Sequence, residues 1–138
     1  MKGLLGPKTL GLRRIAFWGF AVILFTATHW PALQLPGPPN TDKFVHIAAF
    51  GCWTMLLILA AFFGGPLNRR NILLSLVVAL FYAAIDEASQ AIPYIKRSAE
   101  FADYFANLKG IALSGLVAIA LMVLTARSGA DRVSSTKP

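Results

Sequence analysis

Four apolar stretches, each close to membrane length, take up most of this 138-residue sequence. A helix needs about 20 mainly apolar residues to cross the hydrocarbon core of a bilayer, where every backbone polar group must be paired within the protein. The stretches span residues 15–30, 42–63, 72–92 and 100–125. Only 14% of all residues are charged, which excludes an ordinary water-soluble domain. The sequence therefore predicts an all-α membrane protein with four transmembrane helices.

The remaining residues lie mainly in two tails and in short polar connections. We expect a basic tail at residues 1–14, a transmembrane domain at 15–126 and a polar, disordered tail at 127–138. The first apolar stretch also has features of a cleavable signal peptide. However, bulky His29 and Trp30 occupy the region where cleavage requires small residues. We therefore expect this stretch to remain as the first span.

The basic residues are spread over the ends of the apolar stretches, which argues against a nucleic-acid partner despite the net charge of +7. Four spans place both tails on one side, together with the connection at 67–71. That side carries nine of the 13 basic residues: Lys2, Lys8, Arg13, Arg14, Arg69, Arg70, Arg127, Arg132 and Lys137. Because positive residues favour the inner face, the sequence predicts a multi-pass protein of the plasma membrane with both termini in the cytoplasm.

The acidic residues follow the opposite pattern. Asp131 alone lies on the side expected to be cytoplasmic, and the other five carboxylates lie at the far ends of the second, third and fourth stretches: Asp42, Asp86, Glu87, Glu100 and Asp103. An ionisable group at the edge of a hydrophobic span is costly and usually functional. The sequence therefore predicts a polar site where these three helices end at the outer leaflet.

Helical spacing indicates which polar residues share a face. Asp86 and Gln90 are four residues apart, as are Asp103 and Asn107. Capping by an aspartate and a buried network that sets helix register remain alternatives. The candidate ligand-binding residues are Asp42, Lys43, His46, Asp86, Glu87, Gln90, Arg97, Asp103 and Asn107.

Three of these patterns resemble motifs of the VanZ-like family of small membrane proteins. They are Asp42-Lys43-x-x-His46, then Asp86-Glu87-x-x-Gln90, and then Arg97, Asp103, Asn107 and Gly110 in R-x5-D-x3-N-x2-G spacing. The sequence departs from the pattern at Lys109, where an apolar residue is usual, and at Ser114, where glycine is usual. The family takes its name from a member associated with teicoplanin resistance. The resemblance implies a cell-envelope role, with glycopeptide susceptibility as one property to test.

Three functions are compatible with these residues. In the first, Arg97 and Lys43 meet an anionic group on a membrane lipid or lipid-linked cell-wall precursor, and Asn107 and Gln90 hydrogen-bond it. In the second, the protein is a lipid hydrolase or transferase. His46 is then the general base, with Asp86 or Glu87 as its orienting partner or as an acid. A small transporter ranks third, because a carrier needs access from both sides of the membrane and the inner halves of these spans are apolar.

Cofactor and metal chemistry have little support in the sequence. It contains no glycine-rich phosphate loop, no CxxC and no GxSxG. The single Cys52 excludes an intramolecular disulfide. We expect no cofactor and no bound metal. A hard cation such as Mg²⁺ or Ca²⁺ held by a histidine and carboxylates is the alternative, for which no ligand spacing is diagnostic. The oligomeric state stays open.

Overall fold

The computed structural model is all-helical and describes residues 5–30, 38–93 and 100–134, with the side chains of the last helix described as far as Ser128. A short 3-10 turn, Pro7–Thr9, precedes α1 (Leu10–His29), and α2 (Thr41–Ala60), α3 (Arg69–Gln90) and α4 (Phe101–Ser134) follow. Each of the four α-helices is long and apolar enough to cross a membrane. The predicted all-helical class and the four helices of membrane-spanning length and hydropathy are therefore confirmed for the described residues.

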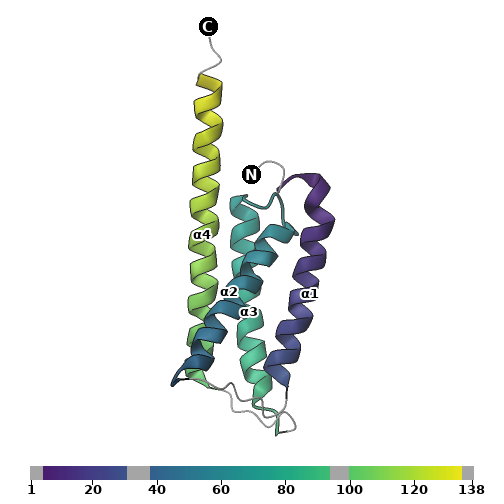
Figure 1. Ribbon diagram of the computed structural model, residues 1–138, viewed down its shortest axis with the longest axis vertical. Helices are drawn as coiled ribbons and strands as arrows, with labels where there is room; N and C mark the ends of the chain where they lie inside the picture. The colour runs from purple at the N-terminus through teal and green to yellow at the C-terminus, as the bar shows by residue number, and fades with distance from the viewer. Residues whose placement is uncertain (1–4, 31–37, 94–99, 135–138) are drawn as a thin grey trace.

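The helices run alternately up and down, so that α1 begins and α4 ends toward the same end of the bundle (Figure 1). We call this the basic end, because it carries Arg13, Arg14, Arg69 and Arg70. The opposite end is the acidic end, which carries Asp42, Asp86, Glu87, Glu100 and Asp103. Helix α2 packs against each of the other three helices, and its contact with α4 is the most extensive.

The contact between α2 and α4 is close because glycines face each other across it. A methyl group on Gly110 would overlap the carbonyl oxygen of Ile47 and lie 2.8 Å from the backbone nitrogen of Gly51. Ser114, one turn further along α4, donates a hydrogen bond of 2.6 Å to the carbonyl of Gly51. Small residues allow helix backbones to approach closely in a membrane, where apolar side chains gain nothing by leaving lipid. The serine at this position therefore keeps the close packing and adds a hydrogen bond.

Side chains close the last turn of α2 at the basic end. The last carbonyls of a helix have no partner within the helix. Here Arg13 Nη1 donates to the carbonyl of Leu59 at 2.6 Å, and Arg14 Nε donates to the carbonyl of Ala60 at 3.2 Å. The arginines of α1 therefore join two helices, a role that the charge pattern alone did not predict.

Asn71 makes a second set of bonds at this end. Its side-chain nitrogen donates to the carbonyls of Ile58 and Pro66 at 2.8 and 3.1 Å, and its oxygen accepts from the backbone nitrogen of Phe63 at 3.1 Å. The side chain is fully buried. One residue at the start of α3 thus holds both the end of α2 and the turn that follows it.

The observed helix limits differ from the predicted ones. Helix α1 begins at Leu10, inside the predicted basic tail, and α4 continues to Ser134, beyond residue 126. The segment 127–134, which was expected to be disordered, is therefore helical. The predicted limits followed hydropathy, whereas helical hydrogen bonding can continue into polar residues. The predicted site residue Arg97 lies outside the described residues.

Candidate functional site

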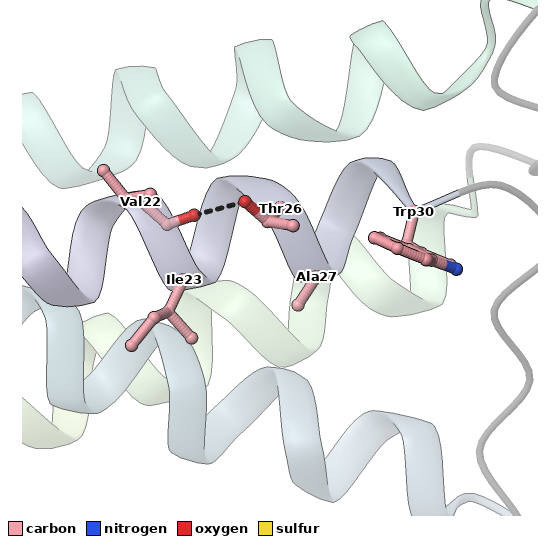
Figure 2. Close-up of a pocket in the computed structure, with 5 residues that line it drawn as sticks. All are labelled: Val22, Ile23, Thr26, Ala27 and Trp30. Carbon is pink, nitrogen blue, oxygen red and sulfur yellow. Dashed lines mark hydrogen bonds between the residues drawn. The ribbon is translucent and has the colours of Figure 1, made fainter.

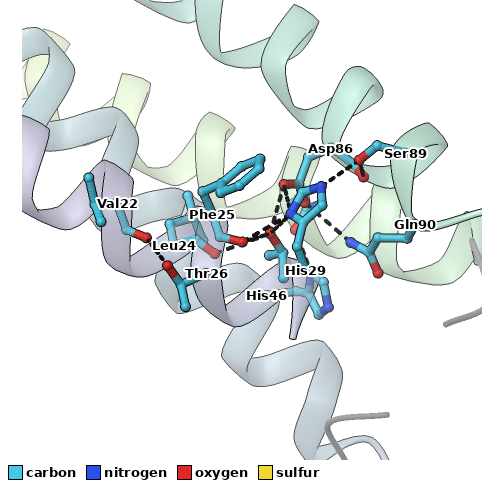
Figure 3. Close-up of polar contacts among 11 residues, drawn as sticks. Val22, Leu24, Phe25, Thr26, His29, His46, Asp86, Ser89 and Gln90 are labelled. Atoms are coloured by element: carbon cyan, nitrogen blue, oxygen red, sulfur yellow. Dashed lines mark hydrogen bonds and ion pairs between the residues drawn. The ribbon is translucent and has the colours of Figure 1, made fainter. Parts of the chain in front are cut away.

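The buried carboxylate of Asp86 is the centre of one polar group at the acidic end (Figure 3). Its Oδ1 accepts a hydrogen bond of 2.8 Å from the Thr28 hydroxyl, and its Oδ2 accepts one of 3.2 Å from Gln90 Nε2. Thr28 belongs to α1, whereas Asp86 and Gln90 lie one turn apart on α3. These bonds join α1 to the end of α3.

His29 extends this group toward the surface. Its Nδ1 lies 3.0 Å from the carbonyl of Phe25, and its Nε2 lies 2.7 Å from the hydroxyl of Ser89. Because a carbonyl only accepts hydrogen bonds, Nδ1 carries a proton and donates to Phe25. The Ser89 hydroxyl has one hydrogen and two acceptors within reach, Nε2 of His29 and the backbone carbonyl of Asp86 at 2.6 Å. The same Nδ1 is 3.8 Å from Asp86 Oδ1, so a protonated His29 would form an ion pair with that carboxylate.

A second polar group forms around Lys43 at the start of α2. Its ammonium lies 2.7 Å from Asp42 Oδ2, 3.2 Å from Glu100 Oε2 and 2.7 Å from Asp103 Oδ1. One cation therefore serves three carboxylates. The sequence had suggested that Lys43 would meet an anionic group of a ligand, but in the structure its charge is already paired.

His46 lies deeper on α2 and is 7% exposed. Its Nδ1 is 2.9 Å from Asn107 Oδ1, and its Nε2 is 3.8 Å from Asp103 Oδ2. The close contact at Gly51 and Gly110 lies about one turn further along both helices and fixes this pairing. Within the described part of the chain, no hydrogen bond or ion pair joins His46 to Asp86 or Glu87, the partners suggested from sequence.

Glu87 ties the end of α3 to the start of α4. Its Oε1 accepts a hydrogen bond of 2.6 Å from the backbone nitrogen of Glu100. Its second oxygen, Oε2, is buried and has no hydrogen-bond partner among the described residues. The same holds for Gln90 Oε1 and Asn107 Nδ2, whose side chains are fully buried. Three predicted site residues on two helices thus keep an unpaired polar atom at the acidic end.

The first helix contributes residues that the sequence analysis did not assign to the site. The prediction placed the site on the second, third and fourth helices, yet Thr28 and His29 of α1 contact Asp86 and Ser89. His29 carried the same indication as His46, an ionisable ring within one turn of the end of an apolar span. Lys109, one departure from the VanZ-like pattern, is exposed on α4.

An open apolar groove of about 410 Å³ lies along the half of α1 nearer the acidic end (Figure 2). It is lined by Val22, Ile23, Thr26, Ala27 and Trp30. Its one lining hydroxyl, on Thr26, already donates to the carbonyl of Val22 at 2.8 Å. The groove therefore offers contact mainly for hydrocarbon, and its other polar side-chain group is the indole N–H of Trp30.

Among the described residues, no three or more His, Cys, Asp or Glu side chains are grouped so that they could hold a metal ion. Comparisons of the chain with known protein families, with curated proteins and with solved structures find no match. The resemblance to the VanZ-like family stays a prediction that rests on the three motifs in the sequence.

Proposed function

We propose that this chain is a VanZ-like membrane protein of the cell envelope. In this proposal it binds the polar head group of a membrane lipid, or of a lipid-linked cell-wall precursor, at the outer leaflet of the plasma membrane. The observation that carries the proposal is the set of unpaired polar atoms at the acidic end: Glu87 Oε2, Gln90 Oε1 and Asn107 Nδ2.

Burying these atoms without hydrogen-bond partners costs free energy of folding, and this cost is the reason to assign them a function. A buried polar group without a partner costs about 1–3 kcal/mol, and lipid supplies no alternative hydrogen bonds. An apolar residue of similar size would pack these positions at lower cost if helix association were the only requirement. A ligand that completes the hydrogen bonds would recover this free energy on binding.

Binding at this site can be tested by the lipid that stays with the purified protein. We expect native mass spectrometry to detect lipid on the full-length protein, and Gln90→Leu and Asn107→Leu to lose it. Ser75→Ala is a matched control, because Ser75 is another fully buried α3 residue whose hydroxyl has no partner among the described residues, and it lies outside the acidic end. Equal lipid retention by folded site variants and control would contradict the proposal.

The proposed orientation places the acidic end at the outer face and the basic end in the cytoplasm. Topology reporters fused after Gly37 and after Pro138 should then give opposite results, with Gly37 outside. The same result from both fusions would exclude this orientation and move the site away from the outer leaflet.

A lipid hydrolase or transferase is the second candidate, and one contact favours it. Ser89 Oγ lies 2.7 Å from His29 Nε2, and His29 Nδ1 lies 3.8 Å from Asp86. A hydroxyl within hydrogen-bond distance of a histidine is the first contact of an activated nucleophile. The second contact would require His29 Nδ1 to exchange the carbonyl of Phe25 for Asp86. This candidate uses His29 as the base in place of His46. Labelling by a fluorophosphonate probe that Ser89→Ala abolishes would support it, and an unlabelled wild-type protein would count against it.

A further inference from the structure

The two unpaired atoms at the acidic end of α3, Glu87 Oε2 and Gln90 Oε1, are both hydrogen-bond acceptors when Glu87 is ionised. The orientation of the Gln90 amide follows from its Nε2, which lies 3.2 Å from a carboxylate oxygen of Asp86 that can only accept. Its Oε1 is therefore the free atom. Glu87 uses Oε1 for the backbone of Glu100 and leaves Oε2 free. Because residues three apart share a helix face, both acceptors lie on the same side of α3.

Because both free atoms accept hydrogen bonds, only a ligand group that donates can pair with them. An ionised phosphate, sulfate or carboxylate only accepts hydrogen bonds, so none of them can pair with Gln90 Oε1 or with Oε2 of an ionised Glu87. The missing partner must donate, which leaves a hydroxyl or an amine. A metal ion is disfavoured, because the described residues contain no group of three or more candidate ligands.

Charge favours the amine over the hydroxyl. The acidic end and its connections carry five carboxylates against four basic residues, Lys43, Lys96, Arg97 and, two residues beyond Asn107 on α4, Lys109. Lys43 is already shared among three of the carboxylates. A surplus of negative charge next to a low-dielectric membrane attracts a cation. An ammonium group supplies both this positive charge and three N–H donors.

We infer that the head group bound at this site carries a primary amine, which lies between Glu87 Oε2 and Gln90 Oε1. The inference rests on the proposed head-group function and makes its ligand class specific. The amine can belong to an ethanolamine lipid or to an amino-acid-bearing precursor, since both present the same ammonium group.

The test compares lipids that differ in their N–H donors. Full-length protein is placed in bilayer nanodiscs that contain equal parts of phosphatidylethanolamine, phosphatidylcholine and phosphatidylglycerol, and the bound lipid is then measured by native mass spectrometry. Choline carries the same charge and phosphate as ethanolamine but has methyl groups in place of N–H donors. Because a hydrogen bond to a charged group changes affinity by about tenfold or more, we expect about tenfold enrichment of phosphatidylethanolamine over phosphatidylcholine.

Glu87→Gln tests the assigned atoms. The new amide oxygen can still accept from the backbone of Glu100, while an N–H donor replaces the free acceptor and the negative charge is lost. We expect the preference for phosphatidylethanolamine to disappear in this variant. Asp131→Asn is the matched control, because it removes a carboxylate from the far end of α4. It should keep the preference.

Water-soluble phosphoethanolamine identifies the source of the amine. If it displaces the bound lipid, the amine-bearing head group is sufficient, and a soluble precursor fragment can be the ligand. If the lipid stays bound, the acyl chains are required, and the ligand is a membrane lipid. Both results are consistent with an amine when the preference is present.

The outcomes separate this inference from the proposed function. Equal retention of phosphatidylethanolamine and phosphatidylcholine, with both lost in Gln90→Leu, would overturn the amine and leave head-group binding in place. A preference for phosphatidylglycerol would also overturn the amine. Lipid retention that no site variant changes would overturn both, provided that circular dichroism and size exclusion show folded protein.

Discussion

The two ends of the helix bundle differ in whether their polar groups are paired by hydrogen bonds. At the basic end, Arg13, Arg14 and Asn71 pair with carbonyls at the end of α2 and in the turn after it. At the acidic end, Glu87 and Gln90 each keep a buried oxygen unpaired among the described residues. Satisfied bonds contribute to folding, whereas unsatisfied buried groups reduce stability unless a ligand completes them. The polar groups of the basic end therefore hold the helices together, whereas those of the acidic end have the properties of a binding site.

The largest effect is expected at the close contact between α2 and α4, which involves neither the polar groups of the basic end nor those of the acidic end. If the close contact between α2 and α4 holds the acidic end together, Gly110→Ala should destabilise the protein by about 3 kcal/mol, because backbone atoms cannot yield to the new methyl group. Thermal unfolding in detergent would measure this change. Gly19→Ala is the control, since a methyl group there meets nothing within 4 Å. An equally stable Gly110→Ala protein would show that the helices are not packed as closely as described.

The next effect tests the basic end as a structural joint. Asn71→Ala leaves two carbonyls and one N–H without their side-chain partner, and we expect a loss of about 2 kcal/mol. Ser75→Ala, at a fully buried position one turn along α3, should not lower stability, because the Ser75 hydroxyl has no partner to lose among the described residues. Chemical unfolding of both variants gives the comparison. Similar losses for the two would remove the distinction between paired and unpaired groups.

A smaller change in stability, with a large change in binding, is expected at the acidic end. Asp86→Asn keeps the shape of the side chain without an ionisable group and can still accept from Thr28, so stability should change by less than about 1 kcal/mol. The Gln90 amide loses the carboxylate that orients it and can turn its N–H toward the ligand. We expect lipid retention to fall sharply in a folded protein. A folded Asp86→Asn variant with full lipid binding would refute the proposed role of this end.

The smallest effect is expected for the exposed arginines at the start of α3. Changing both Arg69 and Arg70 to lysine keeps the charge that favours the inner face, so orientation, stability and lipid binding should stay the same. Arg13→Lys is the contrasting variant, because a lysine cannot reproduce the several carbonyl contacts of the guanidinium. It should lower the melting temperature slightly. A defect in the double lysine variant would assign these arginines a function beyond orientation.

Much of the architecture was predictable from the sequence, because hydropathy reports directly on the physics of membrane spans. Four apolar stretches gave four helices, and the shared position of five carboxylates at the span ends indicated the polar end of the bundle. The helix limits were less accurate. Helix α4 continues to Ser134, since polar residues can extend a helix beyond the apolar span.

The site was predictable only in part, because spacing along one helix does not show which side chains meet across helices. Periodicity correctly put Asp86 and Gln90 on one face, and they hydrogen-bond each other. It did not show that His46 pairs with Asn107, or that Lys43 is shared among three carboxylates. It also left the first helix out of the site.

The sequence by itself determined that this chain forms four apolar helices with five of its six acids gathered at one end. These properties follow from the cost of exposing backbone groups and charges to lipid, and that cost is local to each segment. Only the tertiary structure decided that Thr28 and His29 join Asp86 and Ser89, and which buried atoms remain unpaired. Those outcomes depend on how closely and at what register the helices pack. Register is set by contacts such as that between Gly51 and Gly110, which no single segment specifies.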